Sequence, residues 1–372
     1  MTQIPTPRET VGLVGHVEAE RRLLDAWSSG RLPHGWLIAG PRGIGKATLA
    51  FRFARFLLAH AGPEGSGSDG PSMFGDDAPS LPQSLELAPE HPVFRRVASG
   101  GHADLHVIER RMQDDGKRMQ TVIPVDAVRA AGRGMTLTAG EGGWRIVIVD
   151  GVEEMNVNAA NALLKVLEEP PPRTVLLLVT HAPGRLLPTI RSRCCQLRLS
   201  PLEPELVGSL LKQYCPDMGN AEAETLGGLA DGSIGRALSL AQNGGVEIHR
   251  DLVKLLASLP DLDMKTAHKF ADRLARREAE PQWRTAVELT ARSLSDLVGA
   301  AARGEDLQRR GYSAADAGSL QRLAERASLD RWIEVWEKTS RMFAQADSAN
   351  LDRKQVMLAA LGTMETAARS GV

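Results

Sequence analysis

The feature that most constrains the fold of this 372-residue chain is the glycine-rich segment GPRGIGKAT at residues 40–48. It follows a short apolar run at residues 35–39 and leads into a helical pattern over Thr48–Leu58. A strand, a glycine loop and a helix in this order form a phosphate-binding loop, because glycines let backbone N–H groups turn inward around phosphate oxygens. The sequence therefore predicts an α/β domain with a phosphate cradle made by Gly40, Gly43, Gly45 and Lys46.

The residue after the lysine of such a loop is usually Ser or Thr, whose hydroxyl ligates Mg²⁺. Here that residue is Ala47. Thr48 is the next hydroxyl and belongs to the candidate cofactor-binding set, but it points about 100° away around the helix and is a poor replacement. Lys46 would still reach the outer phosphates. We therefore expect that ATP can bind to this loop, with Mg²⁺ present only if nucleotide binds.

A second signal is the apolar run at residues 146–149, which ends in Asp150. An acid at the tip of a strand beside a phosphate-binding loop would hold Mg²⁺ through water. The next residue in ATPases of this type is a glutamate that activates water, whereas here it is Gly151. Glu153 and Glu154 follow closely, and we expect both to be solvated acids before a helix. The sequence thus predicts a site that holds nucleotide better than it hydrolyses it.

The chain divides into three blocks. Residues 1–200 alternate short apolar runs with helical patterns, which is typical of a parallel sheet covered on both faces. Residues 62 to about 83 are rich in Gly, Ser, Pro and Asp, which indicates a mobile insertion. Residues 201–243 form a small helical block, and residues 244–372 are helical throughout. The predicted strands are Trp36–Ala39, Leu105–Ile108, Arg145–Val149 and Val175–Thr180.

Composition excludes several classes of protein. The net charge of −1 and a pI near 6.8 argue against a free-standing DNA binder with a strongly basic surface. The three cysteines form no spaced framework, and we expect them to be reduced thiols. The chain shows no signal peptide and no long apolar run, so we expect a cytoplasmic protein without membrane contact.

The family is indicated by the run NVNAANALLKVLEEPPP at residues 156–172, followed by TVLLLVTH and PGRLLPTIRSRC. Together these segments closely resemble the AAA+ subunits of bacterial clamp loaders, the tau/gamma and delta-prime subunits of DNA polymerase III. The segments Leu13–His16 and Asp231–Leu238 are similar to the N-terminal box near the adenine and to the sensor-2 helix. The resemblance implies an AAA+ P-loop core at 1–200, a helical lid at 201–243 and an all-α collar for oligomerisation at 244–372.

Two departures from the motor subunits point to one member of this family. With Ala47 and Gly151 in place of the hydroxyl and the glutamate, the chain resembles delta-prime, which often cannot hydrolyse ATP. The resemblance then implies that Arg193, in the SRC motif, acts in trans on the nucleotide of the adjacent subunit. An arginine in that role can accelerate hydrolysis by about 10³–10⁵-fold. Residues 59–125 contain no cysteine, so neither zinc nor another resident metal is expected.

The resemblance also implies partners. These are the tau/gamma and delta subunits in a hetero-oligomeric ring, and through the complex the sliding clamp and primed DNA. The chain would belong to a DNA-directed DNA polymerase (nucleotidyltransferase) holoenzyme without independent activity. The alternative is an active AAA+ ATPase motor, either tau/gamma-like or helicase-like.

Three residue assignments stay open at this stage. Lys165 either contacts DNA phosphate or is a solvated lysine beside Glu168 and Glu169. Arg236 either touches the phosphates of bound nucleotide as sensor 2 or bridges lid and core. The aromatic residues of the last block lie four and seven residues apart and share one helical face, which is either core or a contact between collars. They are Trp332, Trp336 and Phe343.

Overall fold

The computed structural model describes residues 4–60, 82–112, 119–136, 143–304, 306–349 and 351–370. The chain divides into two compact units, Met1–Pro201 and Leu202–Val372. The predicted insertion at residues 62–83 lies, apart from its last two residues, outside the described ranges. The further division of the second unit into lid and collar at residues 243 and 244 stays a prediction.

The first unit is built on a parallel five-stranded sheet with the order β2-β3-β4-β1-β5. The four strands predicted from the sequence are all present. The strand β5 was not predicted, because its four residues carry no apolar run. The strands are β1 (Gly35–Ala39), β2 (Leu105–Ile108), β3 (Arg145–Asp150), β4 (Thr174–Thr180) and β5 (Cys195–Arg198).

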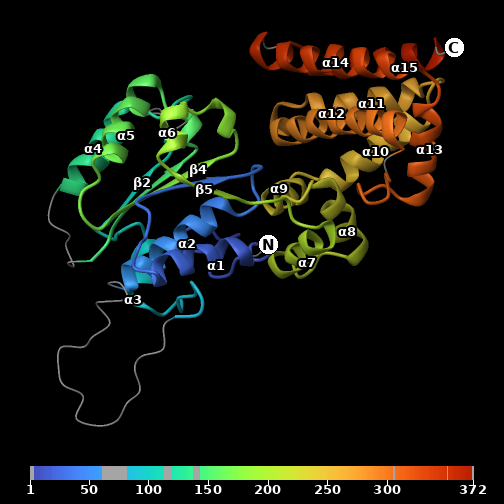
Figure 1. Ribbon diagram of the computed structural model, residues 1–372. Helices are drawn as coiled ribbons and strands as arrows, with labels where there is room; N and C mark the ends of the chain where they lie inside the picture. The colour runs from blue at the N-terminus through green and yellow to red at the C-terminus, as the bar shows by residue number, and fades with distance from the viewer. Residues whose placement is uncertain are drawn as a thin grey trace, which may run out of the picture. The chain divides into compact units, whose positions relative to one another are not determined.

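Helices cover both faces of this sheet (Figure 1). Trp36 and Ile38 of β1 point to one face, while Leu37 points to the other, so successive positions of a central strand are all buried. The helices α1 (Val17–Ser28), α2 (Lys46–Ala59) and α3 (Pro92–Ala98) pack on the first face. The helices α4 (Val125–Thr136), α5 (Val157–Glu168) and α6 (Pro188–Ser192) pack on the second.

Helix α5 begins and ends where the sequence provides a cap and a stop. The Asn156 side chain accepts a hydrogen bond from the backbone N–H of Ala159 at 2.8 Å, and the prolines from residue 170 onward prevent continuation. Ala160 and Leu167 are buried, whereas Val157 in the first turn is 72% exposed.

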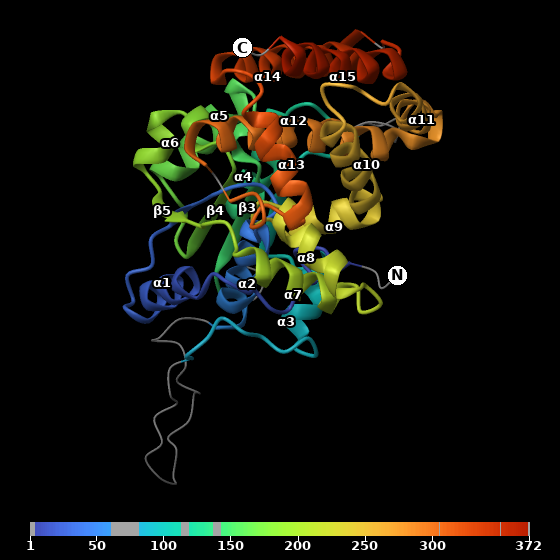
Figure 2. The same cartoon turned by 90° about the vertical axis from the view of Figure 1, so that its right-hand side faces the viewer.

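The second unit is helical in its described part, and no helix of the described chain is long and apolar enough to cross a membrane. The long helices α12 (Glu280–Arg303) and α14 (Leu329–Ala349) pack against each other, and α14 and α15 (Arg353–Arg369) lie side by side (Figure 2). The helices are α7 (Pro204–Tyr214), α8 (Asn220–Leu229), α9 (Ile234–Gln242), α10 (Gly245–Ala257), α11 (Met264–Ala275), α12 (Glu280–Arg303), α13 (Ala314–Ala324), α14 (Leu329–Ala349) and α15 (Arg353–Arg369).

Two glycines bring backbones of the second unit into direct contact. A Cβ on Gly228 of α8 would stand 2.4 Å from the backbone nitrogen of Gly311, which precedes α13. Gly311 has a φ of +90°, and its own Cβ would stand 2.7 Å from the Thr225 carbonyl oxygen. Neither position can therefore hold a side chain without moving the backbone opposite. This contact ties the helices after residue 202 to those after residue 280.

The aromatic residues of α14 do not share one environment. Trp332 and Phe343 are buried, and the indole N–H of Trp332 donates to the Ala324 carbonyl at 3.1 Å. Trp336 is 41% exposed and joins the exposed side chains of Leu329 and Ile333. The spacing places the three rings on neighbouring positions of one helical side, but only Trp332 and Phe343 belong to the core, and Trp336 lies at its exposed edge.

Candidate nucleotide site and the arginine of the SRC motif

The glycine loop between β1 and α2 requires residues without side chains. Gly40 has a φ of +154°, and a Cβ there would stand 2.5 Å from the Leu199 carbonyl oxygen. Gly45 has a φ of +103°, and its Cβ would stand 2.8 Å from Cδ1 of Leu13. Gly43 has a φ of +73° and is exposed. The three predicted glycines therefore form a left-handed, side-chain-free turn of the kind that cradles phosphate.

Lys46 begins α2 and is 6% exposed. Its ammonium donates a hydrogen bond to the Pro41 carbonyl oxygen, so the side chain folds back over the loop. Burial lowers the pKa of Lys46 to about 8, and the negative charge of Asp150 opposes that shift. The ammonium of Lys46 and the carboxylate of Asp150 therefore interact electrostatically. Ala47 and Thr48 follow on the helix, both half-buried.

The segment before α1 packs onto this loop. His16 is buried, and its Nε2–H donates to the Ile44 carbonyl oxygen at 2.7 Å. Burial lowers the pKa of His16, and the hydrogen bond to the Ile44 carbonyl opposes that shift. From α2, Arg55 donates to the Thr10 carbonyl at 2.7 Å, and Arg52 pairs with Glu20 at 2.6 Å. The residues resembling an adenine-side box are therefore fixed to the helix that carries Lys46.

The strand β3 ends in Asp150, as predicted. Burial raises the pKa of Asp150, and the nearby Glu109 carboxylate adds to that shift. Gly151 follows with a φ of +82°, a conformation that L side chains rarely adopt. The site therefore offers one carboxylate at the strand tip and no acid directly after it.

Glu153 and Glu154 are not the solvated acids that the sequence predicts. The side chain of Glu153 is 1% exposed and lies 2.5 Å from Nδ1 of His181. Glu154 is held by Arg42 at 3.2 Å and Arg110 at 2.6 Å. The expectation failed because the acids lie in a turn beneath the loop, where tertiary partners bury them.

Arg42 and His181 were not identified from the sequence. Arg42 Nε donates to Nε2 of His181 at 2.9 Å, so the His181 proton lies on Nδ1 and is donated to Glu153. Burial lowers the pKa of His181, consistent with that neutral tautomer. Burial alone would raise the pKa of Glu153, but the hydrogen bond from the His181 backbone N–H lowers it below its usual value. His181 follows β4 directly, and a polar residue at a strand end was the signal available.

Arg193 caps the C-terminal end of α6 and is partly exposed. Its Nη2 lies 2.9 Å from Oε1 of Glu168, and its Nη1 donates to the Thr189 carbonyl at 3.2 Å. The Arg193 guanidinium therefore has two partners in its own chain, and both Glu168 and Thr189 are exposed residues. Lys165 is exposed one turn before Glu168 on α5.

Arg236 belongs to a charged cluster inside the second unit. Its guanidinium contacts Asp231 and lies 2.5 Å from Oε1 of Glu288 on α12. Asp231, at a φ of +50°, also accepts from Arg292 at 3.2 Å and Arg310 at 3.0 Å. These contacts join the predicted lid to α12 within the second unit, and both roles left open for Arg236, a phosphate contact and a bridge between lid and core, stay predictions.

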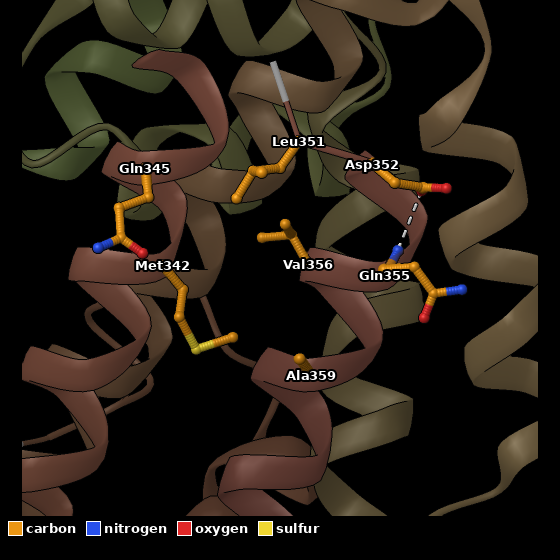
Figure 3. Close-up of a pocket in the computed structure, with 7 residues that line it drawn as sticks. All are labelled: Met342, Gln345, Leu351, Asp352, Gln355, Val356 and Ala359. Atoms are coloured by element: carbon orange, nitrogen blue, oxygen red, sulfur yellow. Dashed lines mark hydrogen bonds between the residues drawn. The ribbon is translucent and has the colours of Figure 1, made fainter. Parts of the chain in front are cut away.

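A pocket of about 330 Å³ lies between α14 and α15 in the second unit (Figure 3). It is lined by Met342, Gln345, Leu351, Asp352, Gln355, Val356 and Ala359. Asp352 caps α15 by accepting from the backbone of Gln355 at 3.2 Å. Asp352 is the one ionisable residue among those that line the pocket, and its carboxylate is already used as a helix cap. Among the described residues no group of three or more His, Cys, Asp or Glu could hold a metal ion, and the expected lack of zinc stays a prediction.

The residues of the loop fit the phosphates of a nucleotide better than they fit a metal. The side-chain-free turn and the buried Lys46 suit phosphate oxygens. Asp150 supplies one metal-binding carboxylate, but Ala47 supplies no hydroxyl. The geometry therefore supports nucleotide binding with incomplete metal coordination.

Comparison with known proteins places these residues in a family context. The family model described as DNA polymerase III, delta subunit, matches residues 84–203. DNA polymerase III subunit delta' of Pseudomonas aeruginosa is 39% identical over 202 residues, 54% of this chain and 53% of that protein. The corresponding subunit of Escherichia coli is 31% identical over 65% of each chain. The matched part thus spans about half to two thirds of the length of these relatives.

A solved structure of a DNA polymerase III gamma subunit-related protein from Thermotoga maritima has 17% sequence identity to this chain and a TM-score of 0.46. It covers 95% of this chain and 100% of that one. The parallel sheet, the glycine loop and the helices on both faces define the α/β P-loop fold of the first unit directly.

Proposed function

We propose that this chain, which resembles the delta-prime subunits of DNA polymerase III over about half to two thirds of its length, is a subunit of a clamp loader. It helps to load the sliding clamp onto primed DNA as part of a ring with tau/gamma and delta subunits. It donates Arg193 to the nucleotide of its neighbour and hydrolyses ATP weakly or not at all. Its loop holds ATP through Gly40, Gly43, Gly45 and Lys46.

The observation that carries this proposal is the backbone at the tip of β3. Asp150 is followed by a left-handed glycine, so the position that would activate water has no carboxylate. The buried Glu153 is committed to His181, and Glu154 is committed to Arg42 and Arg110. Neither acid is free to act as the base. A chain that binds nucleotide but lacks this group suits a subunit that assists its neighbours' hydrolysis.

The first test separates binding from hydrolysis in the purified chain. Binding of a fluorescent ATP analogue is expected for the natural sequence and is expected to be lost in Lys46→Ala, because the ammonium that meets the outer phosphates is gone. Phosphate release should stay at background in both proteins. Turnover by the natural chain that disappears in Lys46→Ala would contradict the proposal.

The second test addresses Arg193 in the complex. A clamp loader reconstituted with Arg193→Ala should assemble normally and hydrolyse ATP more slowly in the presence of clamp and primed DNA, by on the order of 10³-fold if the neighbouring site is isolated. Arg191→Ala, two residues away on α6, is the control. Unchanged turnover at the neighbouring site would refute the trans role.

The alternative, an active AAA+ motor, is favoured by one observation. Asp150 ends β3 and Lys46 begins α2, and the charge of each opposes the pKa shift that burial causes in the other. This alternative predicts Mg²⁺-dependent turnover by the purified chain that Asp150→Asn abolishes. Under the delta-prime proposal, the purified natural chain shows no turnover, and Asp150→Asn leaves that background unchanged.

A further inference from the structure

The guanidinium of Arg193 is held by acceptors of its own chain. Nη2 lies 2.9 Å from Oε1 of Glu168, and Nη1 donates to the carbonyl of Thr189 at 3.2 Å. The two terminal nitrogens are those with which an arginine grips a carboxylate or a phosphate. Each already has a partner inside the chain, and the side chain therefore lies folded toward α5.

The backbones of both residues are fixed by the start of β1. The Leu167 carbonyl, one residue before Glu168, accepts from Nε2 of His34 at 3.1 Å. A Cβ on Gly35 would stand 3.1 Å from Cδ2 of Leu167 and 3.2 Å from the carbonyl oxygen of Arg193. The end of α5 and the turn after α6 are thus packed around one glycine. The pair is built into the fold.

The strength of the pair suits a contact that is made and broken. The side chains of Arg193 and Glu168 are 38% and 49% exposed, so water and salt screen their attraction. Exposed pairs of this kind shift an equilibrium by at most about fivefold. The phosphate of a nucleotide carries more charge than a carboxylate and offers several oxygens. It can therefore take over the guanidinium.

We propose that Glu168 is a positioning residue that stows Arg193 against its own chain until the phosphate of a nucleotide on the neighbouring subunit displaces it. This inference rests on the proposed trans role of Arg193. One ion pair is exchanged for another, and no covalent bond changes. Because stowing stabilises the free state and is absent in the transition state, it lowers kcat/KM for ATP at the neighbouring site.

The test uses the reconstituted complex of this chain with tau/gamma and delta subunits, assayed with ATP, clamp and primed DNA. Glu168→Gln should raise kcat/KM for ATP by about two- to fivefold, with a smaller gain at higher salt. Glu169→Gln, the adjacent exposed carboxylate, is the matched control and should change nothing. In an Arg193→Ala background, Glu168→Gln should have no effect, because nothing is left to release. Equal melting temperatures of the single variants exclude a change in folding.

The results that overturn the inference differ from those that overturn the proposed function. A fall in kcat/KM with Glu168→Gln would show that the carboxylate orients Arg193 for use. An effect shared with Glu169→Gln, or one that persists without Arg193, would show that Glu168 acts elsewhere. In each case Arg193→Ala would still slow hydrolysis. If Arg193→Ala itself leaves hydrolysis unchanged, the trans role fails and the stowing role fails with it.

Discussion

The Glu154 carboxylate occupies the space in which a side chain on Gly151 would have to begin. An ideal Cβ on Gly151 would stand 2.8 Å from Oε2 of Glu154, and the backbone there has a φ of +82°. Glu154 is itself held in place by Arg42 and Arg110. The position after Asp150 is therefore shaped for glycine, and replacing Gly151 with an acid would not by itself place a carboxylate where it could activate water.

Gly151→Glu is expected to reduce stability without creating an ATPase. A side chain at a left-handed position costs about 1–3 kcal/mol, and this one would also repel Glu154. Urea denaturation measures the loss. Gly184→Glu is the control, because that exposed glycine has nothing within 4 Å of an added Cβ and should change stability by less than about 0.5 kcal/mol. Equal stability of Gly151→Glu and the natural chain would contradict the strain.

Nucleotide affinity is expected to fall as pH rises above about 8. Burial lowers the pKa of Lys46 to about 8, while bound phosphate would favour the charged ammonium and raise that pKa. Binding then takes up a proton, and the affinity decreases by up to about tenfold per pH unit above 8. Titrations with a fluorescent ATP analogue at pH 7, 8 and 9 measure this slope.

The control for that slope is another lysine of the same unit. Lys165→Met, on the exposed face of α5, should keep the pH dependence, whereas Lys46→Met should bind too weakly to show it. Affinity that stays constant from pH 7 to 9 in the natural chain would mean that Lys46 remains charged in the empty loop.

The two tryptophans of α14 should respond differently to truncation. Trp332→Ala removes a buried ring and its hydrogen bond to Ala324, and it is expected to cost about 3–5 kcal/mol. Trp336→Ala removes a ring that is 41% exposed and should cost less than about 1 kcal/mol in the isolated chain. Denaturant midpoints with unchanged slopes compare the two. Similar losses would contradict the difference in burial between the two rings.

Stability is expected to decrease on acidification because of His249. Burial lowers its pKa to about 4, Arg292 acts in the same direction, and Asp316 opposes them. Between pH 6.5 and 4 the unfolded chain binds more protons than the folded one, so the contribution is complete above 6.5. It falls by on the order of 3 kcal/mol as pH drops to about 4.

Denaturation of the full chain at pH 7 and pH 4.5 tests this loss. His249→Phe keeps a ring against Tyr312, 5.0 Å away between centroids, and should reduce the difference between the two pH values. His268→Gln, on the exposed side of α11, should leave that difference unchanged. The same pH dependence in both variants would show that other groups cause it.

The sequence predicts the framework of the first unit because its signals are local. A glycine loop between an apolar run and a helical pattern needs only neighbouring residues to be recognised, and Gly40 to Lys46 lie where that pattern requires. Asp150 likewise ends a strand of continuous apolar residues. The short β5 carries no such run, and only its pairing with β1 defines it.

The partners of the site residues could not be predicted, because they come from distant parts of the chain. Glu153 and Glu154 read as surface acids until His181, Arg42 and Arg110 are brought to them by the fold. Arg193 was identified from its motif, but the carboxylate that holds it lies 25 residues earlier (193 − 168), at the end of another helix. Sequence patterns indicate which groups matter, and tertiary packing decides what each is bound to.

The close approach of Gly228 and Gly311 has a mechanical consequence. Helices slide past one another when side chains between them can change rotamer, and here the facing backbones leave no such layer. The Asp231 cluster adds a second point of attachment to α12. A rotation of α7, α8 and α9 would therefore be transmitted to α12 and α13, so these helices should move as one rigid body.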